Sequence, residues 1–268
     1  MNTPELFSRL FTPARLWEKA ENGLRCRLCA RNCLIPEGAF GACGVRLNQG
    51  GSLYTAVGNR VAAVNLDPVE KKPLFHFLPG STIFSVGTLG CNFHCSFCQN
   101  SSISQIEPDP APGPGSGASP SAHPSAEAAT GRAAGPDSAS SASGPNALPN
   151  TFPETFPGAS PAGAAPRIPS MLGRGQAVSA RELADAAERS GARSLAYTYN
   201  EPTVFFELLS DTAALALERG LRNVLVSNGF LSREAFAALR DLIQAANFDL
   251  KSFSPDFYRD LCGASLAP

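Results

Sequence analysis

The segment GCNFHCSFCQN (residues 90–100) places three cysteines on one short loop, in a C-x3-C-x2-C spacing. Thiolates are soft ligands that suit iron-sulfur clusters. Three of them hold three irons of a 4Fe-4S cluster and leave the fourth iron open to a small molecule. The spacing therefore predicts that Cys91, Cys95 and Cys98 bind a reactive 4Fe-4S cluster.

A partial zinc site is the alternative interpretation of this loop. Structural zinc takes four protein ligands, and no fourth Cys or His follows closely, although His94 lies within the loop. The β-branched and aromatic segment TIFSVG (82–87) predicts a strand just before the loop. Ligands gather at the C-terminal ends of such strands in α/β folds, which favours the cluster.

Four further cysteines form an earlier group, Cys26-x2-Cys29-x3-Cys33-x9-Cys43, which glycines close. In a chain without a signal peptide, cysteines in this number favour metal binding over disulfides. Four thiolates make a complete site. The spacing fits structural zinc and an auxiliary iron-sulfur cluster equally, so both interpretations stay open.

The 268 residues are enough for one or two domains, and the hydrophobic content of 43% is ordinary for a soluble protein. The formal net charge of −1 gives no broad attraction to nucleic acid or to an anionic membrane. Residues 1–20 are amphipathic and lack the apolar core of a signal peptide. We therefore expect a cytoplasmic protein that binds neither membrane nor nucleic acid.

Changes in composition divide the chain into four parts. Between residues 107 and 170 lie 14 of the 23 prolines, among Ala, Ser and Gly, which predicts a disordered insertion because little apolar surface can be buried. Two short strands within 53–66, around Gly58-Asn59, predict a hairpin. The expected parts are a four-cysteine knuckle with this hairpin (1–80), a strand and cluster loop (81–106), the insertion (107–175) and the remaining α/β domain (176–268).

Helix and strand patterns alternate after the insertion. We expect helices at 181–190, 203–219, 233–245 and 255–261, and strands at 194–199, 223–226 and 248–250. Strands joined by helices pair in parallel through right-handed crossovers. The predicted fold class is therefore α/β, an open sheet or partial barrel with its site at the C-terminal ends of the strands.

Polar side chains follow each of the last three strands. Glu201 offers a carboxylate to an ammonium group, and Ser227 and Asn228 suit ribose hydroxyls. Asp249 and Lys251 place opposite charges on one face of the chain. Each motif also has an ordinary structural interpretation: Glu201 as a carboxylate at a helix N-terminus, Ser227 and Asn228 as part of a turn, and Asp249 with Lys251 as a surface ion pair. Their shared position at the strand ends favours a ligand site.

Together with the cysteine loop, these motifs resemble radical S-adenosylmethionine (SAM) activases such as pyruvate formate-lyase activating enzymes. The order of the knuckle, the segment 67–77, the cluster loop and the strand-end motifs is most similar to the radical SAM enzyme of the AmmeMemoRadiSam system. The resemblance covers nearly the whole chain outside the insertion.

The resemblance implies a role for each matching residue. Cys91, Cys95 and Cys98 would hold the cluster, Phe97 would contact adenine, Asn200 and Glu201 would face the SAM amino group, Ser227 and Asn228 would line the ribose, and Asp249 and Lys251 would complete the pocket. It implies a partial (β/α)6 barrel, with a 4Fe-4S cluster and SAM as cofactors.

The implied function is that of a radical SAM oxidoreductase. Reductive cleavage of SAM would give a 5′-deoxyadenosyl radical, which abstracts hydrogen from a substrate, with a glycine of a partner enzyme as the leading hypothesis. An electron donor such as flavodoxin or ferredoxin is the implied partner. Modification of another macromolecule stays open.

Two features depart from the family pattern: the insertion, and an end at Pro268 soon after the fourth strand. They suggest a chain truncated after that strand, with an unpaired sheet edge. A catalytically inactive metal-binding scaffold is therefore the alternative function. Cys262 is expected to be a buried structural thiol.

Overall fold

The computed structural model describes residues 3–106 and 168–267. Most of the predicted insertion, residues 107–167, lies outside the described residues. The predicted end of the insertion at residue 175 is wrong, because a 3-10 helix, η2 (Ser170–Gly173), buries Leu172 in the core and Ile168 packs beside it.

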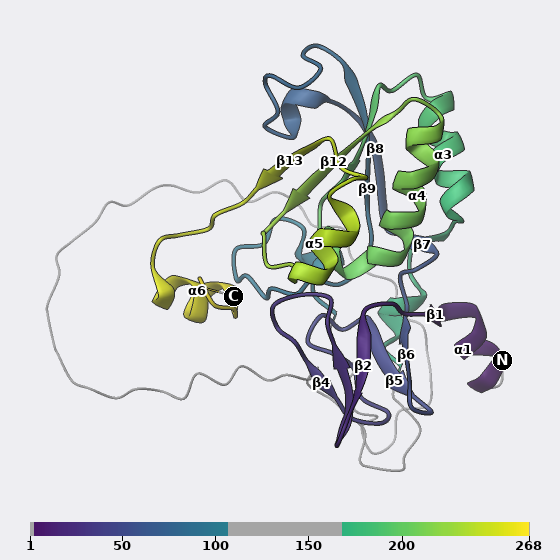
Figure 1. The fold of residues 1–268 in the computed structure, drawn as a ribbon, viewed down its shortest axis with the longest axis vertical. Helices are drawn as coiled ribbons and strands as arrows, with labels where there is room; N and C mark the ends of the chain where they lie inside the picture. Colours follow the sequence, from purple (N-terminus) through teal and green to yellow (C-terminus); the bar gives the residue numbers. More distant parts are fainter. Residues whose placement is uncertain (1–2, 107–167, 268) are drawn as a thin grey trace, which may run out of the picture. The chain divides into compact units, whose positions relative to one another are not determined.

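The main sheet contains five strands in the order β13-β12-β11-β9-β8 (Figure 1). Their bounds are β8 (Ala63–Pro68), β9 (Thr82–Gly87), β11 (Ser194–Tyr197), β12 (Arg222–Ser227) and β13 (Ala245–Phe248). Four of these strands, β9, β11, β12 and β13, pair in parallel, which confirms the predicted pairing. β8 adds a fifth strand, antiparallel to β9, from a part of the chain predicted to belong to the N-terminal knuckle region.

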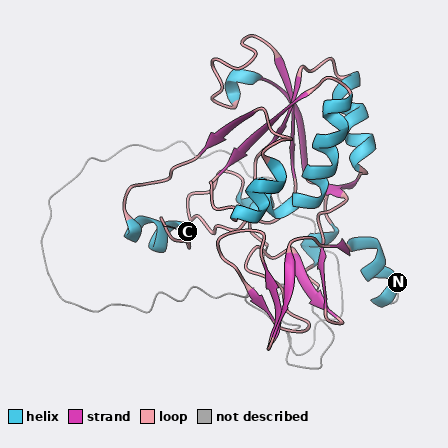
Figure 2. Ribbon diagram, in the orientation of Figure 1, coloured by secondary structure: helices cyan, strands magenta, loops and turns pink. Residues whose placement is uncertain are grey.

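Helices connect the parallel strands: α3 (Ala180–Arg189), η3 (Pro202–Phe205) continuing into α4 (Phe206–Glu218), α5 (Arg233–Leu239) and, after β13, α6 (Pro255–Cys262). Ser179 begins α3 in a capping box with Glu182, which satisfies the first backbone N–H groups of the helix. α4 packs against α3 and α5, and residues of all three helices share one hydrophobic core with β11 and β12 (Figure 2).

Alternate residues of each strand face opposite sides of the sheet. Leu195 and Tyr197 of β11 pack in the main hydrophobic core beneath the helices. Ala196 packs on the other face with Ile83 and Val224 in a smaller core. Both faces are therefore apolar along the strands, and polar groups concentrate in the loops that follow them.

The N-terminal part consists of α1 (Thr3–Leu10) and two antiparallel sheets, ordered β1-β6-β5 and β2-β3-β4. The strands are β1 (Thr12–Pro13), β2 (Trp17–Ala20), β3 (Gly23–Cys26), β4 (Leu34–Ile35), β5 (Arg46–Gln49) and β6 (Ser52–Thr55). Shorter elements are β7 (Arg60–Val61), which pairs with β10 (Gln176–Ala177), η1 (Val69–Lys71) and α2 (Ser101–Ser104).

The predicted hairpin around Gly58-Asn59 is wrong. The hairpin joins β5 to β6 and turns at Gly50 and Gly51, whose φ values of 61° and 69° suit a tight turn. Gly58 has a packing role, because a Cβ there would meet Thr12 Oγ1 at 2.2 Å.

The predicted helix at 233–245 ends early, at Leu239, and the last strand begins at Ala245 rather than at 248. Asn223 of β12 explains the difference. Its backbone N–H donates to Gln244 Oε1 at 2.8 Å and its Nδ2 donates to the Leu242 carbonyl at 3.0 Å. These bonds draw the chain out of the helix and into register with β12.

The described residues therefore form a mixed α/β structure. In residues 3–106 and 168–267, no helix has the length and apolar content needed to cross a membrane.

Candidate active site

The three loop cysteines line one cavity of about 420 Å³ at the C-terminal ends of the parallel strands. Strand-end residues from β11, β12 and β13 line the same cavity. Of the residues predicted from sequence, it brings together Cys91, Cys95, Cys98, Asn200, Glu201, Ser227, Asn228, Asp249 and Lys251.

The segment before the loop is held by Asn200. Its Nδ2 donates to the Gly90 carbonyl at 2.7 Å, and its Oδ1 accepts from Thr88 N at 3.0 Å. Gly90 has a φ of 81°, and a Cβ there would meet the Cys43 carbonyl oxygen at 2.6 Å. The Asn200 side chain thus fixes the entry to the cluster loop, a contact that the sequence pattern did not reveal.

The loop is held on its other side by the end of α6. His94 N donates to the Cys262 carbonyl, and Ser96 N donates to the Leu261 carbonyl, both at 2.9 Å. Cys262 is fully buried, as predicted for a structural thiol. The loop is therefore fixed by backbone bonds from regions far apart in sequence.

Burial is the main influence on the loop thiols. It raises the pKa of Cys91 and Cys95 to about 12, with the nearby Glu201 carboxylate adding to the effect at Cys91. The Cys98 sulfur lies 3.2 Å from Ser104 Oγ. A thiolate is disfavoured in such surroundings unless a cation lies beside it, so these thiols suit a positively charged metal centre.

Glu201 is the hub of the polar groups in the cavity. It is 3% exposed, and its carboxylate accepts from Thr203 N at 3.1 Å, Ser227 Oγ at 2.9 Å and Asn228 N at 2.8 Å. Burial raises the pKa of Glu201, and these hydrogen bonds oppose the rise. The carboxylate is therefore rigidly positioned at the cavity wall.

Asn228 joins this hub to the cluster loop. Its Nδ2 donates to Asn92 Oδ1 at 2.7 Å, and Asn92 directly follows Cys91. Asn92 was not predicted as a site residue. The only sequence signal was its place between a cluster cysteine and the apolar Phe93.

Asp249 and Lys251 form an ion pair of 2.9 Å beside the cavity. Burial alone would lower the pKa of Lys251, but Asp249 and the nearby Cys95 and Cys91 raise it overall. The ammonium group therefore stays charged at the cavity wall.

Phe97 lies apart from the other predicted site residues. Its side chain is 48% exposed, its ring centroid is 5.6 Å from that of Phe257 in α6, and it does not line the cavity. Its contact with adenine stays a prediction.

A second charged group on the cavity wall was missed. Lys72 is 4% exposed and pairs with Asp67 at 2.8 Å, while Lys71 pairs with the same carboxylate at 2.9 Å. Tyr199 OH donates to Asp67 at 3.1 Å. Against the effect of burial, the lysines hold the pKa of Asp67 well below its usual range. The acidic and basic residues at a spacing of four and five were the available signal.

The four cysteines of the N-terminal group line a separate cavity of about 10 Å³. Burial raises the pKa of Cys29, Cys33 and Cys43, and backbone N–H groups of Arg31, Ala42 and Val45 oppose the rise. In the described parts of the chain, no group of three or more His, Cys, Asp or Glu side chains is arranged to hold a metal ion. The metal sites at both cysteine groups therefore stay predictions.

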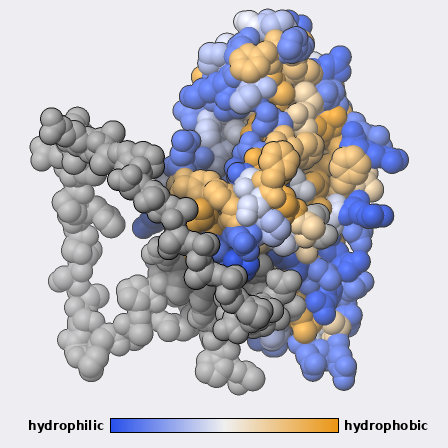
Figure 3. Space-filling view, turned by 90° about the vertical axis from the view of Figure 1, so that its left-hand side faces the viewer, coloured by the Kyte–Doolittle hydropathy of each residue, from blue (hydrophilic) through white to orange (hydrophobic). Residues whose placement is uncertain are grey.

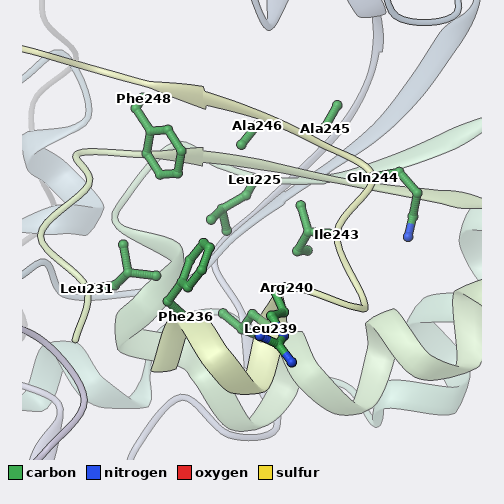
Figure 4. A pocket seen from close by; sticks show the side chains of 10 residues that line it. All are labelled: Leu225, Leu231, Phe236, Leu239, Arg240, Ile243, Gln244, Ala245, Ala246 and Phe248. Atoms are coloured by element: carbon green, nitrogen blue, oxygen red, sulfur yellow. The ribbon is translucent and has the colours of Figure 1, made fainter. Parts of the chain in front are cut away.

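An apolar cavity of about 250 Å³ lies between α5 and the last two strands (Figure 4). Leu225, Phe236, Leu239 and Phe248 point into it. Apolar surface gathers on the face of the molecule that carries β13 (Figure 3). Because few polar groups line this cavity, it offers little chemistry.

Residues 157–266 match the family model of the Radical SAM superfamily. Over this range the chain is similar to proteins of the Radical SAM superfamily. The matched range includes β11, β12 and β13 with their polar loops, and the structure places the Cys91–Cys98 loop against them.

The chain is also 32% identical, over 256 residues, to an uncharacterized protein of Methanocaldococcus jannaschii. The similarity covers 95% of this chain and 57% of the relative. The chain thus spans little more than half the length of that protein.

Proposed function

We propose that the protein is a radical SAM oxidoreductase that works at the cavity beside the Cys91–Cys98 loop. The observation that carries the proposal is the convergence of three thiols from one loop with charged and polar side chains from three strand ends on one cavity of about 420 Å³. The donor set fits the implied groups, because three thiols suit a cluster with one open iron.

When bound, a reduced 4Fe-4S cluster supplies the electron that cleaves SAM into methionine and a 5′-deoxyadenosyl radical. The residues of the chain bind and orient SAM. Glu201 offers a buried carboxylate to the ammonium group of SAM. Asp249 and Lys251 offer a negative and a positive charge to the polar groups of SAM. Asn200 keeps the loop in place through the Gly90 carbonyl.

Residues around the loop also exclude water. Phe93, Phe230 and Tyr258 form an apolar cluster with Cys262, against which Cys91 and Cys95 pack. Phe93 lines the large cavity, so this cluster would shield the loop side of that cavity from solvent.

We further propose that the enzyme resembles the radical SAM component of the AmmeMemoRadiSam system and the glycyl-radical activases. Its substrate is then a glycine of a partner protein, its reductant a flavodoxin or ferredoxin, and its location the cytoplasm. The order of motifs along the sequence supports this narrower proposal. The four N-terminal cysteines are proposed to hold a second metal centre.

Anaerobic reconstitution with iron and sulfide, followed by SAM and a chemical reductant, tests the function. We expect 5′-deoxyadenosine and methionine in equal amounts. Cys98→Ser is the variant expected to form neither, and the matched control Cys262→Ser removes a buried thiol from outside the predicted ligand set. A reconstituted protein that produces no 5′-deoxyadenosine would favour an inactive scaffold.

A further inference from the structure

The cavity between Cys26, Cys29, Cys33 and Cys43 is small. Its volume of about 10 Å³ is at the limit for one water molecule, which needs roughly 10–15 Å³. A 4Fe-4S cluster brings four irons and four sulfides between its thiolates, whereas a single ion needs only the centre of a thiolate tetrahedron. The small volume therefore favours a single zinc ion over an iron-sulfur cluster, a choice that the cysteine spacing leaves open.

Two N–H donors beside this cavity lack an acceptor. Asn92, 0% exposed, and Arg46 both line the cavity. Asn92 Nδ2 and Arg46 Nε have no hydrogen-bond partner among the described residues. Unpartnered buried donors are rare because each costs roughly 1–3 kcal/mol. Their position suggests that the acceptors are the sulfurs.

We propose that the four cysteines bind a single zinc ion, with their sulfurs drawn closer together than in the described residues, where no such group is arranged to hold a metal ion, and that the thiolate ligands accept hydrogen bonds from Asn92 and Arg46. Zinc with four thiolates carries two net negative charges. Arg46 is a buried cation that pairs with Glu207 through Nη2 and whose Nη1 lies 3.3 Å from Cys26 Sγ, so its charge is shared between that carboxylate and the thiolates. Donors of this kind orient the ligands and strengthen metal binding.

The zinc site would also support the wall of the SAM cavity, a role that rests on the proposed function. Ala30 N donates to the Phe230 carbonyl at 3.0 Å, and Ser232 N donates to the Leu28 carbonyl at 3.2 Å. Arg31 donates to the carbonyls of Asn92 and Gly263. The knuckle thereby contacts the cluster loop, the loop after β12 and the end of α6.

Metal analysis of the full chain tests the proposal. The protein is purified anaerobically without reconstitution, and zinc, iron and sulfide are measured in the native chain and in the triple variant Cys91→Ala/Cys95→Ala/Cys98→Ala. We expect one zinc per chain in both. Iron and sulfide retained by the triple variant, or no bound metal in either protein, would overturn the proposal.

Zinc-edge X-ray absorption on the native chain provides a second measurement if the triple variant does not fold. We expect four sulfur neighbours at about 2.3 Å. A shell containing nitrogen or oxygen ligands would contradict the assignment. Neither measurement depends on SAM cleavage, so failure here is distinguishable from failure of the proposed function.

A matched pair of variants tests the role of Asn92. Asn92→Ala removes both its bond to Asn228 and its Nδ2 donor, whereas Asn228→Ala removes the bond between the two side chains and the acceptor of Phe230 N but leaves the Asn92 donor in place. We expect Asn92→Ala to weaken zinc binding about 10-fold or more in competition with a chelator, and Asn228→Ala to leave it unchanged. Equal affinity in the two variants would contradict donation by Asn92.

Discussion

The two cysteine groups differ in the space that their thiols face. Three loop cysteines border a cavity of about 420 Å³ that charged and polar side chains share. Four N-terminal cysteines surround only about 10 Å³. A metal centre with an exchangeable position needs room for a second molecule, while a structural centre excludes it. On this difference we propose that the loop is the reactive site and the knuckle a structural one.

The groups are nevertheless connected. Asn92 lines the small cavity, and its Oδ1 accepts from Asn228 of the large one. Asn228 in turn donates to Glu201. Under the proposal, a metal at the knuckle would stabilise the wall of the large cavity without contributing a ligand to it.

The largest expected effect is at the loop. Cys91→Ala, Cys95→Ala and Cys98→Ala should each abolish the 4Fe-4S absorption and SAM cleavage, because each removes one of only three protein ligands. Absorption spectra and 5′-deoxyadenosine assays check this. SAM cleavage by any of the three variants would contradict the assignment of the reactive cluster to the loop cysteines.

Cys29→Ala should lower the melting temperature by on the order of 10 °C, through loss of the knuckle metal. The loop cluster should still respond to SAM, because its ligands are separate. Calorimetry and the cluster spectrum measure the two effects. A folded Cys29→Ala protein with no spectral response to SAM would show that the sites are not separable.

Asp67→Asn should cost about 3 kcal/mol at neutral pH, because Lys72 is left buried without its partner. The folded pKa of Asp67 lies below its ordinary value of 3.8. Its contribution is therefore fully present above that pH and is lost as the pH falls toward the folded pKa.

Urea unfolding at neutral pH and at about pH 3 measures this difference. Asp256→Asn is the control, since Asp256 forms an exposed ion pair with Arg259 and should change stability by less than about 1 kcal/mol. A loss at Asp67 that does not shrink in acid would argue against a charge effect.

Glu201→Gln should weaken SAM binding and cost roughly 2 kcal/mol of stability, because an amide NH2 then faces groups that donate to the carboxylate. Titration of the reconstituted protein with SAM reports the affinity. Glu218→Gln, at the exposed end of α4, is the neutral control. Unchanged SAM affinity in Glu201→Gln would remove Glu201 from the site.

The smallest effect concerns Phe97. Phe97→Leu removes its ring pair with Phe257 and should cost about 1 kcal/mol. Weaker SAM binding beyond this loss of stability would support the contact with adenine. Equal SAM affinity would leave Phe97 as a packing residue of the loop.

Local patterns predicted much of the fold. The helices at Ala180–Arg189 and Pro255–Cys262 follow from their caps and apolar spacing. The shared cavity of the strand-end motifs follows from the parallel order of the strands. Neither required knowledge of distant contacts.

Features that depend on distant contacts could not be predicted. β8 joins the main sheet through its pairing with β9, and α5 ends where Asn223 bonds to Leu242 and Gln244. Asn92 likewise gains its role from Asn228, a partner that the sequence does not identify. In each case, a tertiary hydrogen bond outweighs the local preference.

Electron paramagnetic resonance of the reduced, reconstituted protein, recorded with and without SAM, tests the central claim most directly. The account predicts a reduced 4Fe-4S signal that shifts when SAM is added, in the native chain and in Cys29→Ala alike, because SAM binds at the iron that the loop leaves open. A reduced cluster whose signal does not change with SAM, or one that persists in Cys98→Ala, would contradict it.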